Sequence, residues 1–374
     1  MTATNNRTQR LEILDLARGF GFLIVLLQHC LSFLGPTVAL RFVPQDATVL
    51  DFFFLMSGFF AGYAYEGKLR DGRKTIAQAI SERAVRMFPL LVLSSLLGVM
   101  SFLAWAPTRK DFLLLFTLAV KGSLLIPADG RQLGAGDLFP LDGPLWFLLY
   151  DWFAYLLFLF VLRHFSLKGL LAVAAVALTG LWCAAISRNT VTFGPFWADC
   201  AWSVPRTLAD FTIGLILFRC YRPNRFVIGP RFGVAPGLAL LVLVLLPVPA
   251  GWAYSGVLQA AIATFVMPVI IFFGAYIEAD ALMARLAGFA KTIALPVYML
   301  HAPVIRTLSL LRWDLHLRGA AEGVLLVAEF LFPIALAFLI GKYLETPLHS
   351  FVNANFRSPT RGQDAAPRQA TSHV

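Results

Sequence analysis

Ten apolar runs, most of them close to the length of a membrane-spanning helix, constrain this chain more than any other feature. A helix needs roughly 20 mostly apolar residues to cross the hydrocarbon core of a bilayer. The hydrophobic share of the 374 residues is 59%, above the roughly 45–50% of soluble domains. We therefore predict an all-α, polytopic membrane protein with about ten transmembrane helices. The runs lie at residues 13–35, 48–66, 86–105, 143–162, 169–187, 201–218, 233–254, 257–277, 293–312 and 321–344.

The charges between the runs predict how the spans are oriented. Lys and Arg gather in segments 67–86, 163–168 and 219–231, and such residues mark cytoplasmic loops. Ten spans with both termini in the cytoplasm place these segments inside and the acidic segment 128–142 outside. A shorter run at 112–127 is therefore predicted to be re-entrant or interfacial. The net charge of +10 has the same explanation, so we do not expect nucleic acid as a partner.

A polar stretch at the end of the chain sets the predicted domain boundary. Residues 1–352 form one membrane-embedded domain in this interpretation. Residues 353–374 are rich in Arg, Ser, Gln and Pro and are predicted to be a disordered cytoplasmic tail. The four cysteines are scattered without CxxC spacing, so we expect neither a metal site nor a disulfide framework.

The first run carries ionisable residues on one predicted helix face. His29 follows Arg18 by eleven positions, which is about three turns and about 16 Å along a helix axis. Asp15 lies three positions before Arg18, close enough to pair with it. Ionisable residues within a span are unfavourable and indicate function by default, and neutral imidazole is a natural general base. The alternative is an Arg18 that reaches the cytoplasmic rim and a His29 that a neighbouring helix satisfies.

Two further runs carry charges that could bind substrate. Arg83 and Arg86 lie one turn apart at a predicted cytoplasmic helix start, where guanidinium groups suit phosphates; positive-inside anchoring is the alternative. Asp151 lies about two turns inside the run that begins near Trp146. A carboxylate at that depth needs a function or a buried arginine partner.

Polar residues elsewhere in the runs have simpler interpretations. Arg206 and Asp210 are four positions apart and can pair on one helix face, as a structural ion pair or as a substrate contact. Ser57 and Gly58 interrupt a series of phenylalanines. We expect them to serve helix packing, because no G-x-S-x-G nucleophile motif is present.

The ninth run contains two prolines around a possible substrate-binding histidine. Tyr298 and His301 are three positions apart on one predicted face, and Pro296 and Pro303 break or kink the helix. His301 could bind a substrate, or it could cap a backbone carbonyl that a proline leaves free.

Taken in order, these residues resemble the acyltransferase family 3 membrane proteins, which O-acylate sugars and glycans. The resemblance covers most of the chain. Many members continue the tryptophan segment as W-x4-E-E-Q-F-Y, whereas this chain has Asp151, Trp152 and Tyr155. It is more similar to the branch with glucan succinyltransferases and polysaccharide O-acetylases. The motifs are Arg18-x10-His29, FFFLMSGFF, Arg83-x-x-Arg86-x-x-Pro89, the Trp146 segment, Tyr298-x-x-His301-x-Pro303 and Glu345-x-Pro347.

The resemblance implies a ten-helix enzyme of a bacterial inner membrane that moves an acetyl or succinyl group from cytoplasmic acyl-CoA to a carbohydrate or glycan hydroxyl. His29, Arg18 and Asp15 would be the catalytic residues, with His29 as the general base or an acyl carrier. Arg18 would steady the thioester oxygen or a CoA phosphate, and Arg83 and Arg86 would bind acyl-CoA. Acyl-CoA is a substrate, so no tightly bound cofactor is expected. A multi-pass sugar or lipid transporter is the alternative, with the buried Arg, Asp and His as its path. The residues expected to support the acceptor are Asp151, Trp146, Tyr155, Tyr298 and His301.

Overall fold

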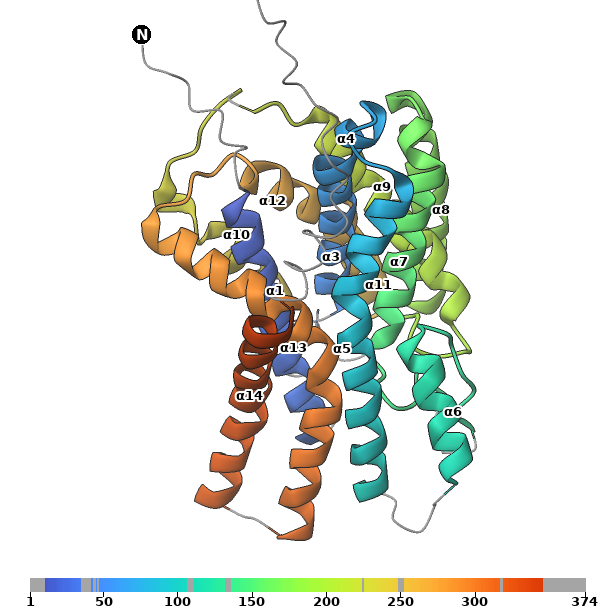
Figure 1. Ribbon diagram of the computed structural model, residues 1–374. Helices are drawn as coiled ribbons and strands as arrows, with labels where there is room; N and C mark the ends of the chain where they lie inside the picture. Colours follow the sequence, from blue (N-terminus) through green and yellow to red (C-terminus); the bar gives the residue numbers. More distant parts are fainter. Residues whose placement is uncertain are drawn as a thin grey trace, which may run out of the picture.

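A computed structural model describes nine parts of the chain, which form helices joined by turns (Figure 1). In these parts there is no strand beyond two isolated β-bridges, Asp137–Phe196 and Ile228–Ile277. The segment 353–374, predicted as a tail, lies outside the described residues. The described residues are 11–34, 42, 45, 47–105, 111–131, 136–223, 225–247, 252–316 and 319–345.

Each predicted run overlaps a helix or a helical series. Seven helical units within the described ranges are long and apolar enough to cross a membrane. The prediction of a polytopic membrane protein agrees with this finding. The count of about ten spans stays a prediction. The elements are α1 (Glu12–Leu34), α3 (Ala47–Ala61), η1 (Gly62–Glu66), α4 (Gly67–Arg70), α5 (Ile76–Trp105), α6 (Phe112–Ser123), α7 (Leu145–Phe160), η3 (Leu162–His164), α8 (Leu167–Arg188), η4 (Cys200–Trp202), α9 (Ser203–Cys220), η5 (Pro230–Phe232), α10 (Ala235–Val244), α11 (Ser255–Ala261), η6 (Ile262–Val266), α12 (Met267–Gly274), α13 (Ala281–Asp314), α14 (Ala320–Ile340) and η7 (Gly341–Glu345).

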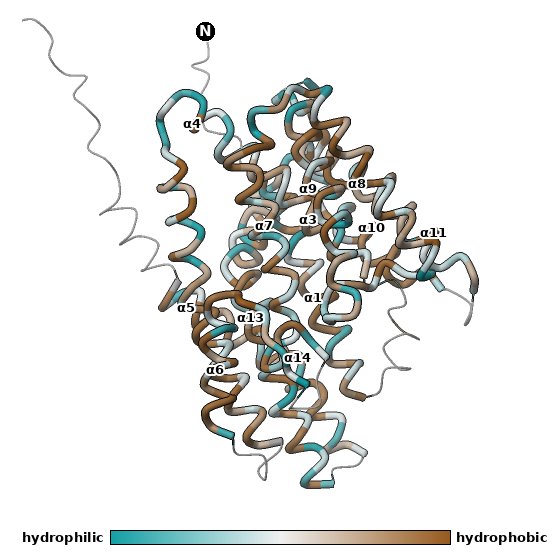
Figure 2. Tube along the Cα trace, turned by 90° about the vertical axis from the view of Figure 1, so that its right-hand side faces the viewer, coloured by the Kyte–Doolittle hydropathy of each residue, from teal (hydrophilic) through white to brown (hydrophobic). Residues whose placement is uncertain are grey.

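The basic segments gather at one end of the bundle. Figure 1 shows α4, the start of α8 and the segment after α9 at the end where α1 begins. Figure 2 shows hydrophilic residues around α4 and hydrophobic stretches along α6 and α8. This is the charge distribution that the loop pattern predicts. The orientation of this end in a membrane stays a prediction.

The run at 112–127 contains a short helix, and its re-entrant or interfacial placement stays a prediction. Helix α6 has 12 residues, and Figure 1 shows it beside α5 at the end away from the basic segments. Leu115 and Leu118 are buried in a cluster with Phe102 of α5. At about 1.5 Å per residue a helix of this length covers a little over half of the hydrocarbon core.

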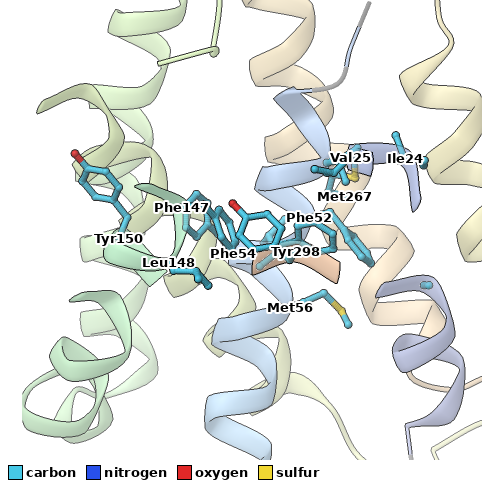
Figure 3. Close-up of a cluster of buried hydrophobic side chains, with 14 of the residues drawn as sticks. Ile24, Val25, Phe52, Phe54, Met56, Phe147, Leu148, Tyr150, Met267 and Tyr298 are labelled. Atoms are coloured by element: carbon cyan, nitrogen blue, oxygen red, sulfur yellow. The ribbon is translucent and has the colours of Figure 1, made fainter. Parts of the chain in front are cut away.

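The centre of the core is aromatic and lies where α3, α7 and α13 meet. Phe54 and Phe147 stack with ring centroids 4.3 Å apart, and Figure 3 shows Tyr298 beside them. Close helix packing brings α3 against α9. A Cβ atom on Gly58 would lie 1.9 Å from the backbone oxygen of Phe211. The packing interpretation is therefore confirmed for Gly58.

A fully buried ion pair also joins α3 to α9. Arg206 Nε lies 2.5 Å from Asp51 Oδ1, and the other two guanidinium nitrogens donate to the carbonyls of Ala47 and Val191 at 2.6 and 2.7 Å. The direct ion-pair partner of Arg206 is therefore Asp51, while Asp210, which the spacing offered, interacts electrostatically with both residues. The guanidinium group of Arg206 donates to three acceptors from two segments at the same time. A contact with one residue four positions away on the same helix would satisfy fewer of its donors.

Candidate active site

Two cavities lie inside the bundle, and Tyr298 lines both of them. We call the first, of about 310 Å³, the arginine cavity. We call the second, of about 330 Å³, the histidine cavity. The cationic side chains that line the arginine cavity are Arg18, Arg83, Arg86 and Lys291. The polar and ionisable side chains around the histidine cavity include Gln28, His29, Ser32, Asp137 and Thr192.

Helix α1 contributes to both cavities. Arg18 lines the arginine cavity and His29 lines the histidine cavity, about 16 Å apart along the axis for eleven residues. Between them, the Phe22 ring packs against Tyr298 with centroids 5.5 Å apart. The helix therefore presents the two predicted residues to different chambers, so one small group cannot contact both.

The arginine cavity carries excess positive charge. Its described lining has four cationic side chains and the two carboxylates Glu82 and Asp151, which leaves a formal charge of +2. Arg18 lies 3.7 Å from Asp15, so the predicted pair is confirmed, and it sits over the Phe60 ring at 4.6 Å. Such a chamber suits an anionic group with apolar parts.

Asp151 pairs with Arg83 inside this cavity. The Arg83 guanidinium also lies 4.4 Å from the centre of the Tyr155 ring, and the Tyr155 hydroxyl donates to the Ala79 carbonyl at 3.1 Å. The sequence predicts a function or a buried arginine partner for Asp151, and Arg83 is that partner. Asp151 and Tyr155 line the arginine cavity rather than the chamber that contains His29.

The hydrogen bond of His29 determines which ring nitrogen is free. Nδ1 lies 3.0 Å from the Val25 carbonyl oxygen. A carbonyl oxygen can only accept, so Nδ1 carries the proton and Nε2 keeps its lone pair in the neutral ring. The His301 ring stands edge-on to His29 with centroids 4.7 Å apart. This tautomer is the one that a general base needs.

His301 is buried behind His29. It is 1% exposed, and its Nδ1 lies 2.8 Å from the Tyr298 carbonyl and 3.0 Å from that of Val297. Pro303 would free the carbonyl four positions earlier, at residue 299, so His301 does not cap it. Among the described residues its Nε2 has no hydrogen-bond partner.

Several lining residues carry no sequence motif and were not predicted. Gln28 and Ser32 flank His29 on α1, and their side chains bond at 3.0 Å. Lys291 precedes Tyr298 on α13 by seven positions, which is about two turns. The two residues therefore lie on the same helix face, and this spacing is the signal that could have predicted Lys291. Trp146, which was predicted, lines the histidine cavity. The side chain of Glu345 and all of Pro347 lie outside the described residues.

Comparison with known proteins adds a family to this geometry. A family model described as an acyltransferase domain matches residues 11–342. The chain belongs to acyltransferase family 3. "Protein 2 in picA locus" of Rhizobium radiobacter is 32% identical over 152 residues, which are 37% of this chain and 76% of that protein. No solved structure matches the chain.

Membership of acyltransferase family 3 indicates an O-acyltransferase. With its several apolar helices, this member is an integral, multi-pass membrane protein that works in a lipid bilayer on an acceptor substrate. The family supports the enzyme interpretation over the transporter.

One loop carboxyl of this acyltransferase family 3 member has a strongly perturbed environment. Asp142 precedes α7, is 1% exposed and accepts a hydrogen bond from Ser94. Burial raises its pKa to about 7, while Ser94 and Arg306 act in the opposite direction. The folded protein therefore keeps this carboxyl protonated well above the ordinary aspartate pKa of about 3.9.

We expect this proton to make stability fall as the pH rises from about 4 to about 7, by up to about 1.4 kcal/mol per pH unit. In that range the folded state holds the proton and the unfolded state does not. Melting temperatures of Asp142→Asn across this range should show a shallower decline than the parent. Asp129→Asn, which changes an exposed acid paired with Arg131, is the control. An unchanged slope in Asp142→Asn would contradict the assignment.

Proposed function

We propose that the protein transfers a short acyl group, acetyl or succinyl, from cytoplasmic acyl-CoA to a hydroxyl of a carbohydrate or glycan. The observation that carries the proposal is the pair of chambers that meet at Tyr298, one cationic and one containing His29. Separate chambers suit a reaction with two large substrates that share only the transferred group. A bacterial inner membrane is the proposed location.

The arginine cavity is the proposed site of acyl-CoA. Its positive charge suits the CoA phosphates, and guanidinium groups bind phosphate oxygens with paired hydrogen bonds. Arg18 lies with Arg83 and Arg86, which favours a phosphate contact for it over a contact with the thioester oxygen. The cavity is built from helices that begin or end among the basic segments, which supports a cytoplasmic donor.

The histidine cavity is the proposed site of the acceptor. Its lining combines the rings of Trp146, Phe193 and Phe196 with the polar side chains around His29. Apolar walls with a few polar groups are typical of small-ligand sites. A sugar ring can pack its C–H face on an aromatic ring while its hydroxyls bond to Gln28 or Asp137.

In the proposed reaction, His29 Nε2 removes the proton from the acceptor hydroxyl. The hydroxyl oxygen attacks the thioester carbonyl, the carbon–sulfur bond breaks, and the thiolate takes the proton from the imidazolium to leave as CoA thiol. In the acyl-carrier form, His29 Nε2 attacks the thioester carbonyl, the carbon–sulfur bond breaks, and the thiolate leaves as CoA thiol with the ring proton. The acceptor hydroxyl then attacks the acyl-imidazole, the carbon–nitrogen bond breaks, and the hydroxyl proton returns to the ring. Asp151, Tyr155 and His301 are proposed as supports of the two chambers.

The function can be tested with purified protein in lipid, acetyl-CoA or succinyl-CoA, and a panel of neutral oligosaccharides. We expect release of CoA thiol that depends on the acceptor, together with an acylated sugar in the mass spectrum. Absence of thiol release with every donor and acceptor, together with absence of CoA binding, would contradict the proposal.

Removal of Arg86 tests the donor site. We expect Arg86→Ala to raise the KM for acyl-CoA by about 10–100-fold, the effect of losing one hydrogen bond to a charged group, with a smaller change in kcat. The measurement is thiol release against acyl-CoA concentration. Arg70→Ala is the control, because Arg70 belongs to the basic end but lies largely in solvent. Equal KM values in Arg86→Ala and the parent would remove Arg86 from the donor site.

A further inference from the structure

Tyr298 occupies the boundary between the two cavities. Tyr298 lines both cavities, yet only 2% of the residue is exposed. We propose that Tyr298 is a gate, closed in this structure, which must move aside before the thioester of a donor in the arginine cavity can reach His29. This inference rests on the proposed function for the identity of the donor, but the barrier itself can be tested without any donor.

An aromatic partition surrounds the Tyr298 ring. Its ring centroid lies 5.5 Å from that of Phe22 and 5.5 Å from that of Phe147. Phe53 closes the group, 4.3 Å from Phe22 and 6.0 Å from Phe147. The four rings come from α1, α3, α7 and α13 (Figure 3 shows Tyr298 and Phe147). Rings at these distances pack against one another, and this packed wall is the barrier that the proposal requires.

A hydrogen bond to the wall of the histidine cavity holds the ring in the closed position. The Tyr298 hydroxyl donates to the Pro144 carbonyl at 2.6 Å. Pro144 precedes α7 and lines the histidine cavity, so the bond joins α13 to the wall of that chamber. A hydrogen bond of this kind adds little net stability, which lets substrate binding open the contact.

The helix that carries Tyr298 is weakened on both sides of it. Pro296 and Pro303 lie inside α13. Each lacks an N–H and leaves one backbone carbonyl of the preceding turn without its helical donor. The segment between the prolines can therefore shift more easily than a regular helix. A gate of this kind keeps water from the thioester until the acceptor chamber is engaged.

The gate can be tested by the reaction of an introduced thiol. Ser57 lines the arginine cavity and Ser32 lines the histidine cavity. We would introduce Ser57→Cys or Ser32→Cys into a chain whose native cysteines are replaced by serine, and reconstitute it in sealed vesicles. A small, charged, membrane-impermeant thiol reagent is then added outside. The protein can insert into the vesicles in either orientation. The share of Ser32→Cys protein that reacts quickly gives the fraction of molecules whose histidine cavity faces the reagent.

In that orientation we expect the Ser57→Cys thiol to react slowly when Tyr298 is present. Tyr298→Ala should raise the labelling rate at least tenfold. Tyr298→Phe keeps the ring but loses the bond to Pro144, and should raise the rate about fivefold, the population change that one net hydrogen bond supplies. The matched control is Tyr276→Phe, a buried tyrosine whose hydroxyl accepts from the Arg222 N–H at 3.1 Å, and its rate should not change.

Equal labelling rates in Tyr298→Ala, Tyr298→Phe and the parent would overturn the gate. If Tyr298→Ala does not fold, the Tyr298→Phe rate decides alone. The labelling requires neither acyl-CoA nor turnover, so its outcome is separate from that of the acyltransfer assay. Transfer that depends on His29 with no change in labelling would leave the proposed function intact and remove the gate.

Discussion

His29→Ala is expected to lower acceptor-dependent acyl transfer by about 10²–10⁴-fold, the usual contribution of a general base. The ring suits this task because Nδ1 donates to the Val25 carbonyl, which leaves Nε2 with its lone pair, and because His29 lines the histidine cavity. Alanine removes that lone pair and keeps the helix. The measurement is CoA thiol release with and without acceptor, at equal amounts of folded protein in lipid.

A matched histidine supplies the control. His316 also places Nδ1 against a backbone carbonyl, that of Trp313 at 2.8 Å, but it is exposed and lines neither cavity. His316→Ala should retain transfer. Full activity in His29→Ala would exclude both proposed roles of His29. An acyl adduct on His29, trapped with donor alone and found by mass spectrometry, would select the acyl-carrier form.

The positions of the helices along the chain could be predicted from the sequence because their signals are local. A long apolar run marks a helix wherever it packs, so each predicted run overlaps an observed helix. The short length of helix α6 follows from the short length of the apolar run at 112–127. Likewise, Asp15 and Arg18 are one turn apart, and their pairing depends only on the helix that contains both.

The site required information that no local pattern contains. Asp151 meets Arg83 across 68 positions of sequence, and Arg206 meets Asp51 across 155. Local spacing offered Asp210 to Arg206, whereas packing brought the directly bonded acceptors from other segments. Helix periodicity correctly placed Arg18 and His29 on one helix, but the aromatic side chains between their chambers come from α3, α7 and α13 as well as from α1.

The second large effect concerns stability and follows from the buried pair of Asp51 and Arg206. Both side chains have no exposed surface. Asp51→Ala removes the directly bonded carboxylate from the buried guanidinium, which keeps its two carbonyl acceptors and the nearby Asp210. Breaking a buried pair in this way is expected to destabilise the protein by about 3–5 kcal/mol. Thermal unfolding of the purified variant should show a clearly lower melting temperature and a poorer yield of folded protein.

Two further variants separate loss of the pair from loss of a side chain. Asp71→Ala removes an acid whose partner Arg73 is exposed, and a surface pair of this kind contributes little, so the melting temperature should hardly change. Replacing both partners, Asp51→Leu with Arg206→Met, removes the unpaired charge and should recover much of the lost stability. If Asp51→Ala melted like the parent, the pair would not hold α3 to α9. Because Arg206 also lines the histidine cavity, a double variant that is stable but inactive would show that this pair shapes the acceptor chamber as well as the fold.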